Sequence, residues 1–154
     1  MRRWTCLAAL AGALAGASAG AQAPDADVRA AIERLFEGMR TADSVMVRSV
    51  LAPTARFAML DARATPVAIV ARPVDGWVTA IGNSSRRWDE RLYDVQIRVD
   101  GNLAQAWTPY TFYLDKQVRH CGVNAIELLK DAGGWKITQI SDTQRREGCR
   151  DVLK

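Results

Sequence analysis

The sequence is poor in the residue types that build metal and nucleotide sites. Its 154 residues include one histidine, His120, and three cysteines, none of which stand in a C-x-x-C spacing. Structural zinc sites take four cysteine or histidine ligands at short, regular spacings. A glycine-rich loop of the kind that cradles phosphates is also absent from the sequence. We therefore expect neither a metal ion nor a cofactor.

Long apolar runs are missing as well. The run Cys6–Ala17 is too short to cross a bilayer as a helix, which takes about 20 residues. It follows two arginines and precedes small residues up to Ala23, a pattern typical of a secretory signal peptide. We expect cleavage after Ala21, with Ala19 and Ala23 as the alternative points. An uncleaved anchor or an amphipathic first helix is the other interpretation, and the place of Cys6 before the apolar run argues against a lipoprotein anchor.

Removal of residues 1–21 would leave residues 22–154 as a single domain. The formal charge of the whole chain, +4, would fall to +2, because both arginines of the signal peptide would leave with it. So small an excess gives little reason to expect nucleic acid or an anionic membrane as a partner. We expect a periplasmic or secreted protein that has no membrane association once the signal peptide is gone.

Two cysteines, Cys121 and Cys149, would remain after export. Disulfides persist in oxidising compartments, so export favours a bridge between them. Chain-entropy arguments give such a bridge about 3–4 kcal/mol of stabilisation. Two buried free thiols, or a thiol nucleophile, are the alternatives.

The apolar pattern predicts helices in the first part of the domain. A helix over residues 25–42 has apolar residues three and four positions apart on one face. A second helix is predicted to begin at Asp43 or Ser44 and to stop at Pro53. A third, short helix is predicted over residues 75–81. The stripe of the first helix consists of Val28, Ile32, Leu35, Phe36 and Met39.

Strands are predicted for most of the remaining chain. Pro109 is expected to mark a bulge or a bend, and the mixed-charge segment 86–91 is expected to be a solvated loop. Turns such as Asp100-Gly101-Asn102 predict antiparallel hairpins. Helices followed by hairpins predict an α+β fold, in which a curved antiparallel sheet wraps over the helices and leaves a cone open at one end. The expected strands are 56–60, 67–70, 92–99, 103–114, 118–130 and 135–141.

Several segments resemble NTF2-like proteins, the superfamily with the SnoaL and ketosteroid-isomerase fold. Residues 36–43 and 50–57 resemble its first two helices and first strand, and residues 134–143 resemble its last strand. The pieces Trp107–Tyr113 and His120–Asn124 are similar to a narrower group of exported bacterial members labelled lumazine-binding. The resemblance covers most of the chain and implies a cone-shaped domain with two or three N-terminal helices.

This resemblance leaves the function open. The same cone hosts ketosteroid isomerase, polyketide cyclases, dehydratases, epoxide hydrolases and proteins without any chemistry. Isomerases and cyclases of the fold need a carboxylate or histidine base in a dry cavity, with donors aimed at a developing oxyanion. The ketosteroid isomerase motif is not matched residue by residue, so no catalytic assignment is carried over.

His120 and Asp142 are the candidate catalytic residues. Histidine is the side chain whose unperturbed pKa lies nearest neutral pH, and an aspartate that closes the last predicted strand could act as a base. The alternatives are a structural histidine that bonds to the sheet and an aspartate that caps the following turn.

The candidate ligand-binding residues lie on two predicted strands. Trp107, Tyr110 and Tyr113 offer flat faces with polar tips to a ligand, although such a set also serves core packing. Asn124 and His120 share a parity, which predicts that both lie on one face of the sheet.

Three functions remain open at this point. The first is binding of a small hydrophobic or aromatic molecule in the cone, and the second is acid–base catalysis there, such as isomerisation, cyclisation or dehydration. The third is an interaction module without a ligand. Apolar residues on both faces of the predicted sheet indicate a homodimer.

Overall fold

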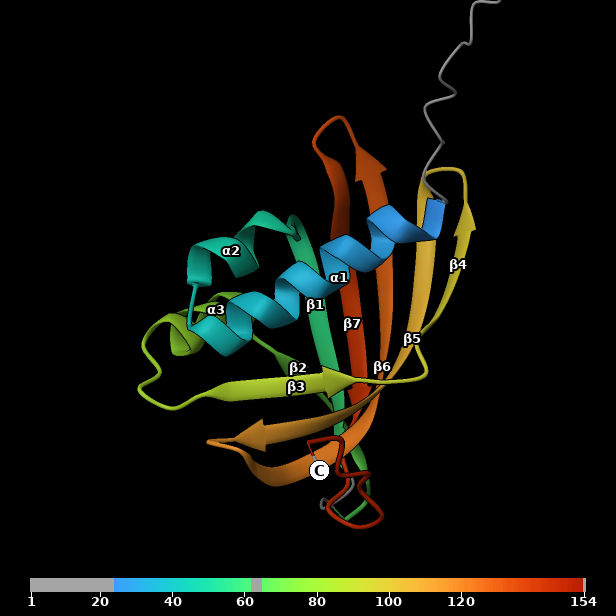
Figure 1. Ribbon diagram of the computed structural model, residues 1–154. Helices are drawn as coiled ribbons and strands as arrows, with labels where there is room; N and C mark the ends of the chain where they lie inside the picture. Colours follow the sequence, from blue (N-terminus) through green and yellow to red (C-terminus); the bar gives the residue numbers. More distant parts are fainter. Residues whose placement is uncertain (1–23, 62–64, 154) are drawn as a thin grey trace, which may run out of the picture.

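The computed structural model describes residues 24–61 and 65–153. In these residues, three helices lie against a curved sheet of seven strands (Figure 1). The predicted signal peptide, residues 1–21, lies outside the described residues and stays a prediction. In the part of the chain that is described, no helix is long and apolar enough to cross a membrane.

The first predicted helix is confirmed as α1, Pro24–Thr41. Proline suits the first turn of a helix, because its fixed φ matches the helix and its missing N–H leaves no intrahelical bond unmade. The first turn is acidic and the last contains Arg40, as the helix dipole favours. The predicted apolar stripe is buried throughout: Val28, Ile32, Leu35, Phe36 and Met39.

The second helix, α2, is shorter than predicted and spans Ser44–Ser49. Its start is confirmed, because the side chain of Asp43 accepts a hydrogen bond from the Met46 N–H at 2.8 Å. Its predicted end at Pro53 is wrong. Strand β1 already begins at Leu51, which pairs with Ile137. Sheet pairing therefore takes the chain out of the helix before the proline is reached.

The third helix, α3, spans Val74–Gly82 and confirms the prediction for residues 75–81. The sheet runs in the order β2-β1-β7-β6-β5-β3, and β4 also pairs with β5. β1 and β7 are parallel, and the remaining pairs are antiparallel. The strands are β1 Leu51–Asp61, β2 Ala68–Arg72, β3 Trp88–Leu92, β4 Gln96–Asp100, β5 Leu103–Leu114, β6 Gln117–Asp131 and β7 Gly134–Thr143.

The mixed-charge segment 86–91 was expected to be a solvated loop, and this expectation is wrong. Most of it forms β3, an edge strand that pairs with β5. Asp89 is only 4% exposed, and its carboxylate accepts hydrogen bonds from Arg40 at 3.2 Å and Arg91 at 2.9 Å. The two arginines neutralise the buried carboxylate of Asp89. Because Arg40 lies in the last turn of α1, its hydrogen bond connects β3 to the end of that helix.

The predicted strand over residues 92–99 is divided in the structure. β3 ends at Leu92, β4 begins at Gln96, and Asp94 between them has a positive φ of 49°. The interruption faces Pro109 of β5, which has no N–H to continue a ladder. Pro109 itself keeps its register with β6, and the irregularity lies between Phe112 and Tyr113. The proline therefore splits the neighbouring strand and causes no bulge in its own.

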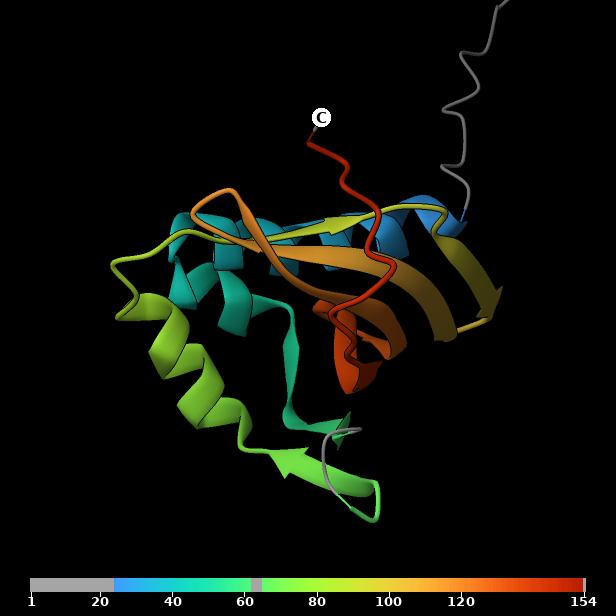
Figure 2. The same ribbon diagram turned by 90° about the horizontal axis from the view of Figure 1, so that it is seen from below.

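The sheet curves around α1, as predicted. Figure 1 shows α1 crossing the concave face, and Figure 2 shows the sheet bending around the helices from below. Along β5 and β6, the inward residues nearest the β5–β4 hairpin are small or aliphatic and belong to the core. These core residues are Ala104, Ala106, Ile126 and Leu128.

The C-terminal segment is held against β6. Cys121 and Cys149 form the predicted disulfide. Cys121 and Arg145 also exchange two backbone hydrogen bonds, of 2.9 and 2.8 Å. The hydroxyl of Tyr113 accepts the Val152 N–H at 2.8 Å. These contacts fix the chain beyond β7 at one end of the sheet.

Gly122 lets β6 and the end of β7 approach closely. A Cβ at this position would overlap the carbonyl oxygen of Thr143. Gly122 is in turn opposite Tyr110 of β5 in the sheet. Any larger residue would have to push the two strands apart.

We expect Gly122→Ala to lower the free energy of unfolding by about 1–3 kcal/mol, as other overpacked sites do. Gly76→Ala is the matched control, because a Cβ at Gly76 meets no heavy atom closer than 3.9 Å and alanine favours the helix. Chemical denaturation of both variants measures the difference. Equal stabilities would contradict the close approach.

Candidate functional site

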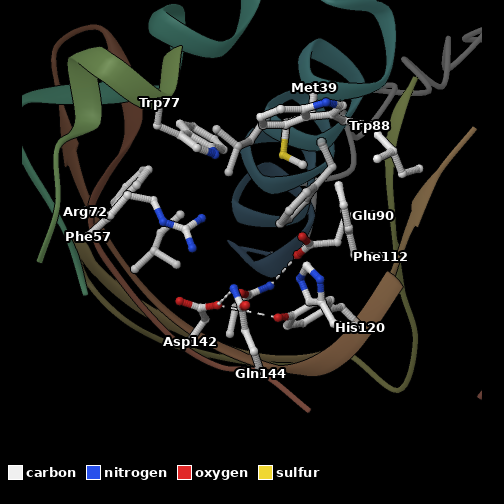
Figure 3. Close-up of a pocket in the computed structure, with 16 residues that line it drawn as sticks. Met39, Phe57, Arg72, Trp77, Trp88, Glu90, Phe112, His120, Asp142 and Gln144 are labelled. Atoms are coloured by element: carbon white, nitrogen blue, oxygen red, sulfur yellow. Dashed lines mark hydrogen bonds between the residues drawn. The ribbon is translucent and has the colours of Figure 1, made fainter. Parts of the chain in front are cut away.

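A cavity of about 300 Å³ lies between the helices and the concave face of the sheet. Such a volume is at the lower end of the range for small-molecule pockets. The polar side chains gather on the sheet and the aromatic ones lie around them (Figure 3). The apolar lining is Leu35, Phe36, Met39, Phe57, Trp77, Trp88, Phe112, Leu114 and Ile140, and the polar lining is Arg72, Glu90, Tyr110, His120, Asn124, Asp142 and Gln144.

Glu90 enters the cavity from the edge strand β3. Its Oε1 accepts a hydrogen bond from the Asn124 side chain at 2.8 Å. Burial, with a smaller effect of the nearby Asp142 carboxylate, raises the pKa of Glu90 to about 8, against the lowering effect of the Asn124 bond. At neutral pH the carboxyl group therefore keeps its proton and can donate it.

Asp142 lies near the end of β7 and is held by two polar neighbours. Its Oδ2 accepts a hydrogen bond from Gln144 Nε2 at 3.0 Å and lies 3.5 Å from the Tyr110 hydroxyl, which is also 3.0 Å from the Thr143 carbonyl oxygen. Burial, and then the charges of Glu90 and Asp142, raise the pKa of Tyr110. The phenol is therefore a hydrogen-bond donor beside the Asp142 carboxylate.

His120 is packed between two rings. Its imidazole stacks on Phe112, with centroids 4.8 Å apart, and meets the edge of Tyr110 at 5.8 Å. Burial lowers the pKa of His120, although Asp142 acts in the opposite direction. The neutral imidazole can accept a proton at one nitrogen and donate from the other.

Arg72, the last residue of β2, reaches into the cavity from the other side. Figure 3 shows its guanidinium group pointing to the middle of the cavity, with Glu90 and His120 across from it. Its Nη2 lies 3.1 Å from the sulfur of Met59. The cavity thus brings one guanidinium, two carboxyl groups and one imidazole together inside an aromatic wall.

Comparisons with solved structures find the same fold in bacterial proteins. An NTF2-like protein of unknown function from Shewanella baltica aligns with a TM-score of 0.64 and 16% identity, over 80% of this chain and 94% of that one. A candidate dehydratase of the NTF2-like family from Streptomyces avermitilis aligns with a TM-score of 0.62 and 15% identity, over 80% and 99%. A candidate scytalone dehydratase from Novosphingobium aromaticivorans aligns with a TM-score of 0.64 and 8% identity, over 82% and 89%. The chain has the NTF2-like fold.

At these identities the likeness concerns the NTF2-like fold alone. No family model and no curated protein sequence matches the chain. The narrower resemblance to the group labelled lumazine-binding is not shown by these structures and stays a prediction.

Of the residues proposed from the sequence, four line the NTF2-like cavity: Tyr110, His120, Asn124 and Asp142. The shared face of His120 and Asn124 is confirmed. Tyr110 reaches the cavity through the regular alternation of β5, without the bulge that was expected at Pro109.

Trp107 and Tyr113, also proposed as ligand-binding residues, do not line this cavity. Trp107 is 52% exposed and lies over a groove with Val123 and Ala125. Tyr113 follows the irregularity in β5, is 1% exposed, and donates a hydrogen bond to Asp151 at 2.9 Å. Its role is to hold the C-terminal segment.

Glu90 and Arg72 were missed by the sequence analysis. Glu90 stands between Trp88 and Leu92 at alternate positions, so a strand with an inward face could have been recognised there. The surrounding charges hid this signal, because mixed charges usually mark a solvated segment. The sequence around Arg72 has no comparable alternating pattern. Only the folded sheet shows that the side chain at the end of the edge strand β2 is directed into the cavity.

The raised pKa of Glu90 makes stability depend on pH. In the unfolded chain this group ionises near pH 4.5, whereas in the folded protein it holds its proton up to about pH 8. The folded state binds more protons between these values, so the free energy of unfolding falls as pH rises from about 4.5 to 8.

We expect Glu90→Gln to remove most of this slope and to raise stability relative to the unchanged protein at pH 8. Glu33→Gln, an exposed site on α1, is the matched control and should leave the slope intact. Urea denaturation at a series of pH values measures both. A slope that survives in Glu90→Gln would show that other groups cause it.

Proposed function

We propose that this protein binds a small, flat, largely apolar molecule in its cavity and catalyses proton transfer on it, as in an elimination or isomerisation. The observation that carries the proposal is the pairing of a protonated carboxyl, Glu90, with a second carboxyl, Asp142, in one aromatic-lined cavity. A buried carboxyl that keeps its proton at neutral pH beside a second carboxyl is typical of acid–base sites.

The cavity walls suit a flat ligand. Phe57 and Trp77 meet edge to face with centroids 5.1 Å apart, and Trp88 and Phe112 do so at 6.2 Å. These pairs stand on both sides of the polar groups, so a ring could lie between them while its substituents reach the sheet. Aromatic walls with a few convergent polar groups are typical of small-molecule sites.

The polar groups divide into proton acceptors and donors. In an elimination of water, Asp142 or His120 would take a proton from carbon and Glu90 would give its proton to the departing hydroxyl. The C–H and C–O bonds break, a C=C bond forms, and water leaves. Glu90 is then a carboxylate and the base is protonated, and proton exchange with solvent restores both. Asn124 gives one amide N–H to Glu90 and has a second that could donate to an oxygen atom of the ligand, whereas the single O–H of Tyr110 is directed at the Thr143 carbonyl and Asp142.

Two of the similar structures are described as candidate dehydratases, which supports this class of reaction. Binding without chemistry is the alternative use of the same cavity. The catalytic and the binding proposals differ in one respect: in the first the polar groups of the cavity affect turnover, and in the second they affect only the affinity for the ligand.

Solvent exchange tests the proposal without a known substrate. A panel of small aryl ketones is incubated with the protein in D₂O, and mass spectrometry follows deuterium uptake next to the carbonyl. We expect Glu90→Gln, Asp142→Asn and His120→Ala to slow the exchange by about 100-fold or more, as loss of general acid–base catalysis does. Glu33→Gln is the control.

Tryptophan fluorescence of Trp77 and Trp88 reports binding of the same ketones. If they bind but no variant alters the exchange, the protein is a binding protein and the catalytic proposal is wrong.

Export and dimerisation remain proposals. The disulfide supports an oxidising compartment, and thus the predicted periplasmic or secreted location. A homodimer is supported by apolar residues left exposed around a groove, among them Ile69, which is 81% exposed, and Trp107.

Light scattering after size exclusion should show a dimer that Trp107→Lys converts to a monomer. Val45→Lys, at an exposed apolar residue on α2, is the matched control and should leave the dimer intact. A monomer in the unchanged protein would refute the dimer.

A further inference from the structure

We propose that the cavity selects ligands that carry a carboxylate, which Arg72 binds, so that the preferred ligand is a small aromatic or otherwise flat monocarboxylic acid. This inference deepens the proposed function and rests on it, because it names the class of molecule that enters the same cavity.

The guanidinium of Arg72 forms no ion pair with any carboxylate of the described residues. Its polar neighbour is the thioether of Met59. Other arginines near the cavity are paired: Arg40 with Asp89 at 3.2 Å, and Arg91 with the same residue at 2.8 Å. A thioether is a weak acceptor, so most of the five N–H donors of Arg72 remain available.

The guanidinium also faces the reacting groups. β2 and β3 are the two ends of the strand order, and the curvature of the sheet brings Arg72 and Glu90 to opposite sides of one cavity (Figure 3). Burial raises the pKa values of Glu90 and Tyr110, and the positive charge of Arg72 opposes this rise; for His120, burial lowers the pKa and the charge of Arg72 adds to the lowering. The charge of Arg72 thus acts on residues of three strands that line the cavity.

A flat ring can lie directly beside the guanidinium. Phe57 is opposite Arg72 in the β1–β2 pairing, and Trp77 packs against Phe57. Arginine binds carboxylates through two parallel hydrogen bonds, and a partly buried guanidinium gains most from such a partner. A carboxylate on Arg72 would orient the rest of the ligand across the cavity towards Glu90 and His120.

The experiment compares two probes of nearly equal shape, 2-naphthoate and the neutral 2-naphthamide. Isothermal titration, with tryptophan fluorescence as a second readout, gives both affinities at pH 7. We expect the unchanged protein to bind naphthoate at least about 10-fold more tightly, because the carboxylate accepts charge-assisted hydrogen bonds from Arg72.

The variant Arg72→Gln should lose this preference and keep its affinity for naphthamide. Arg72→Lys should keep part of the preference for naphthoate. If Arg72→Gln fails to fold, the lysine variant still tests whether the charge at this position sets the preference. Arg56→Gln, at an exposed arginine on the neighbouring strand, is the matched control and should behave as the unchanged protein does.

The outcomes separate the two proposals. Equal affinities in the unchanged protein, or a preference that survives Arg72→Gln, would overturn the carboxylate inference and leave the cavity as a ligand site. Binding of neither probe would count against the proposed function itself, and the carboxylate inference would fall with it.

Discussion

The structure depends on how α1 packs across the curved sheet. Its apolar stripe fills the hollow next to the small and aliphatic residues of β5, β6 and β7, where burial of apolar surface stabilises the fold. α1 ends at Thr41, and farther along the same strands the inward residues become polar or aromatic. One packing arrangement therefore creates the core and leaves the cavity beside it.

The edge strand β3 supplies a polar residue of the cavity, as the central strands do. Pro109 interrupts the pairing along β5, so that β3 and β4 form separate pieces of the same edge. Arg40 and Arg91 hold the buried Asp89 of β3 in place. Because adjacent residues of a strand point to opposite sides, this anchoring directs Glu90 to the cavity. The charged segment 86–91, which resembles a surface loop in its sequence, thus supplies Glu90, the carboxyl proposed as the general acid.

The electrostatics of the cavity follow from its depth. Burial in the cavity shifts the pKa values of a carboxyl, a phenol and an imidazole so that each favours its neutral form. Arg72 and Asp142 lie among these groups without a direct ion pair in the described residues. Such a site can polarise a ligand from two directions, and this is the physical basis of both proposals made for it.

The sequence by itself determined the three helices apart from the end of α2, the long hairpins and the α+β class, because these follow from local periodicity and turn residues. It favoured the Cys121–Cys149 bridge without deciding it, and the structure contains that bridge. The sequence also placed His120, Asn124 and Asp142 on strands whose inward face proved to line the cavity. Only the tertiary structure decided that Glu90 and Arg72 face each other and that Trp107 does not join them. Those facts depend on curvature and on contacts between distant strands, and no local pattern encodes them.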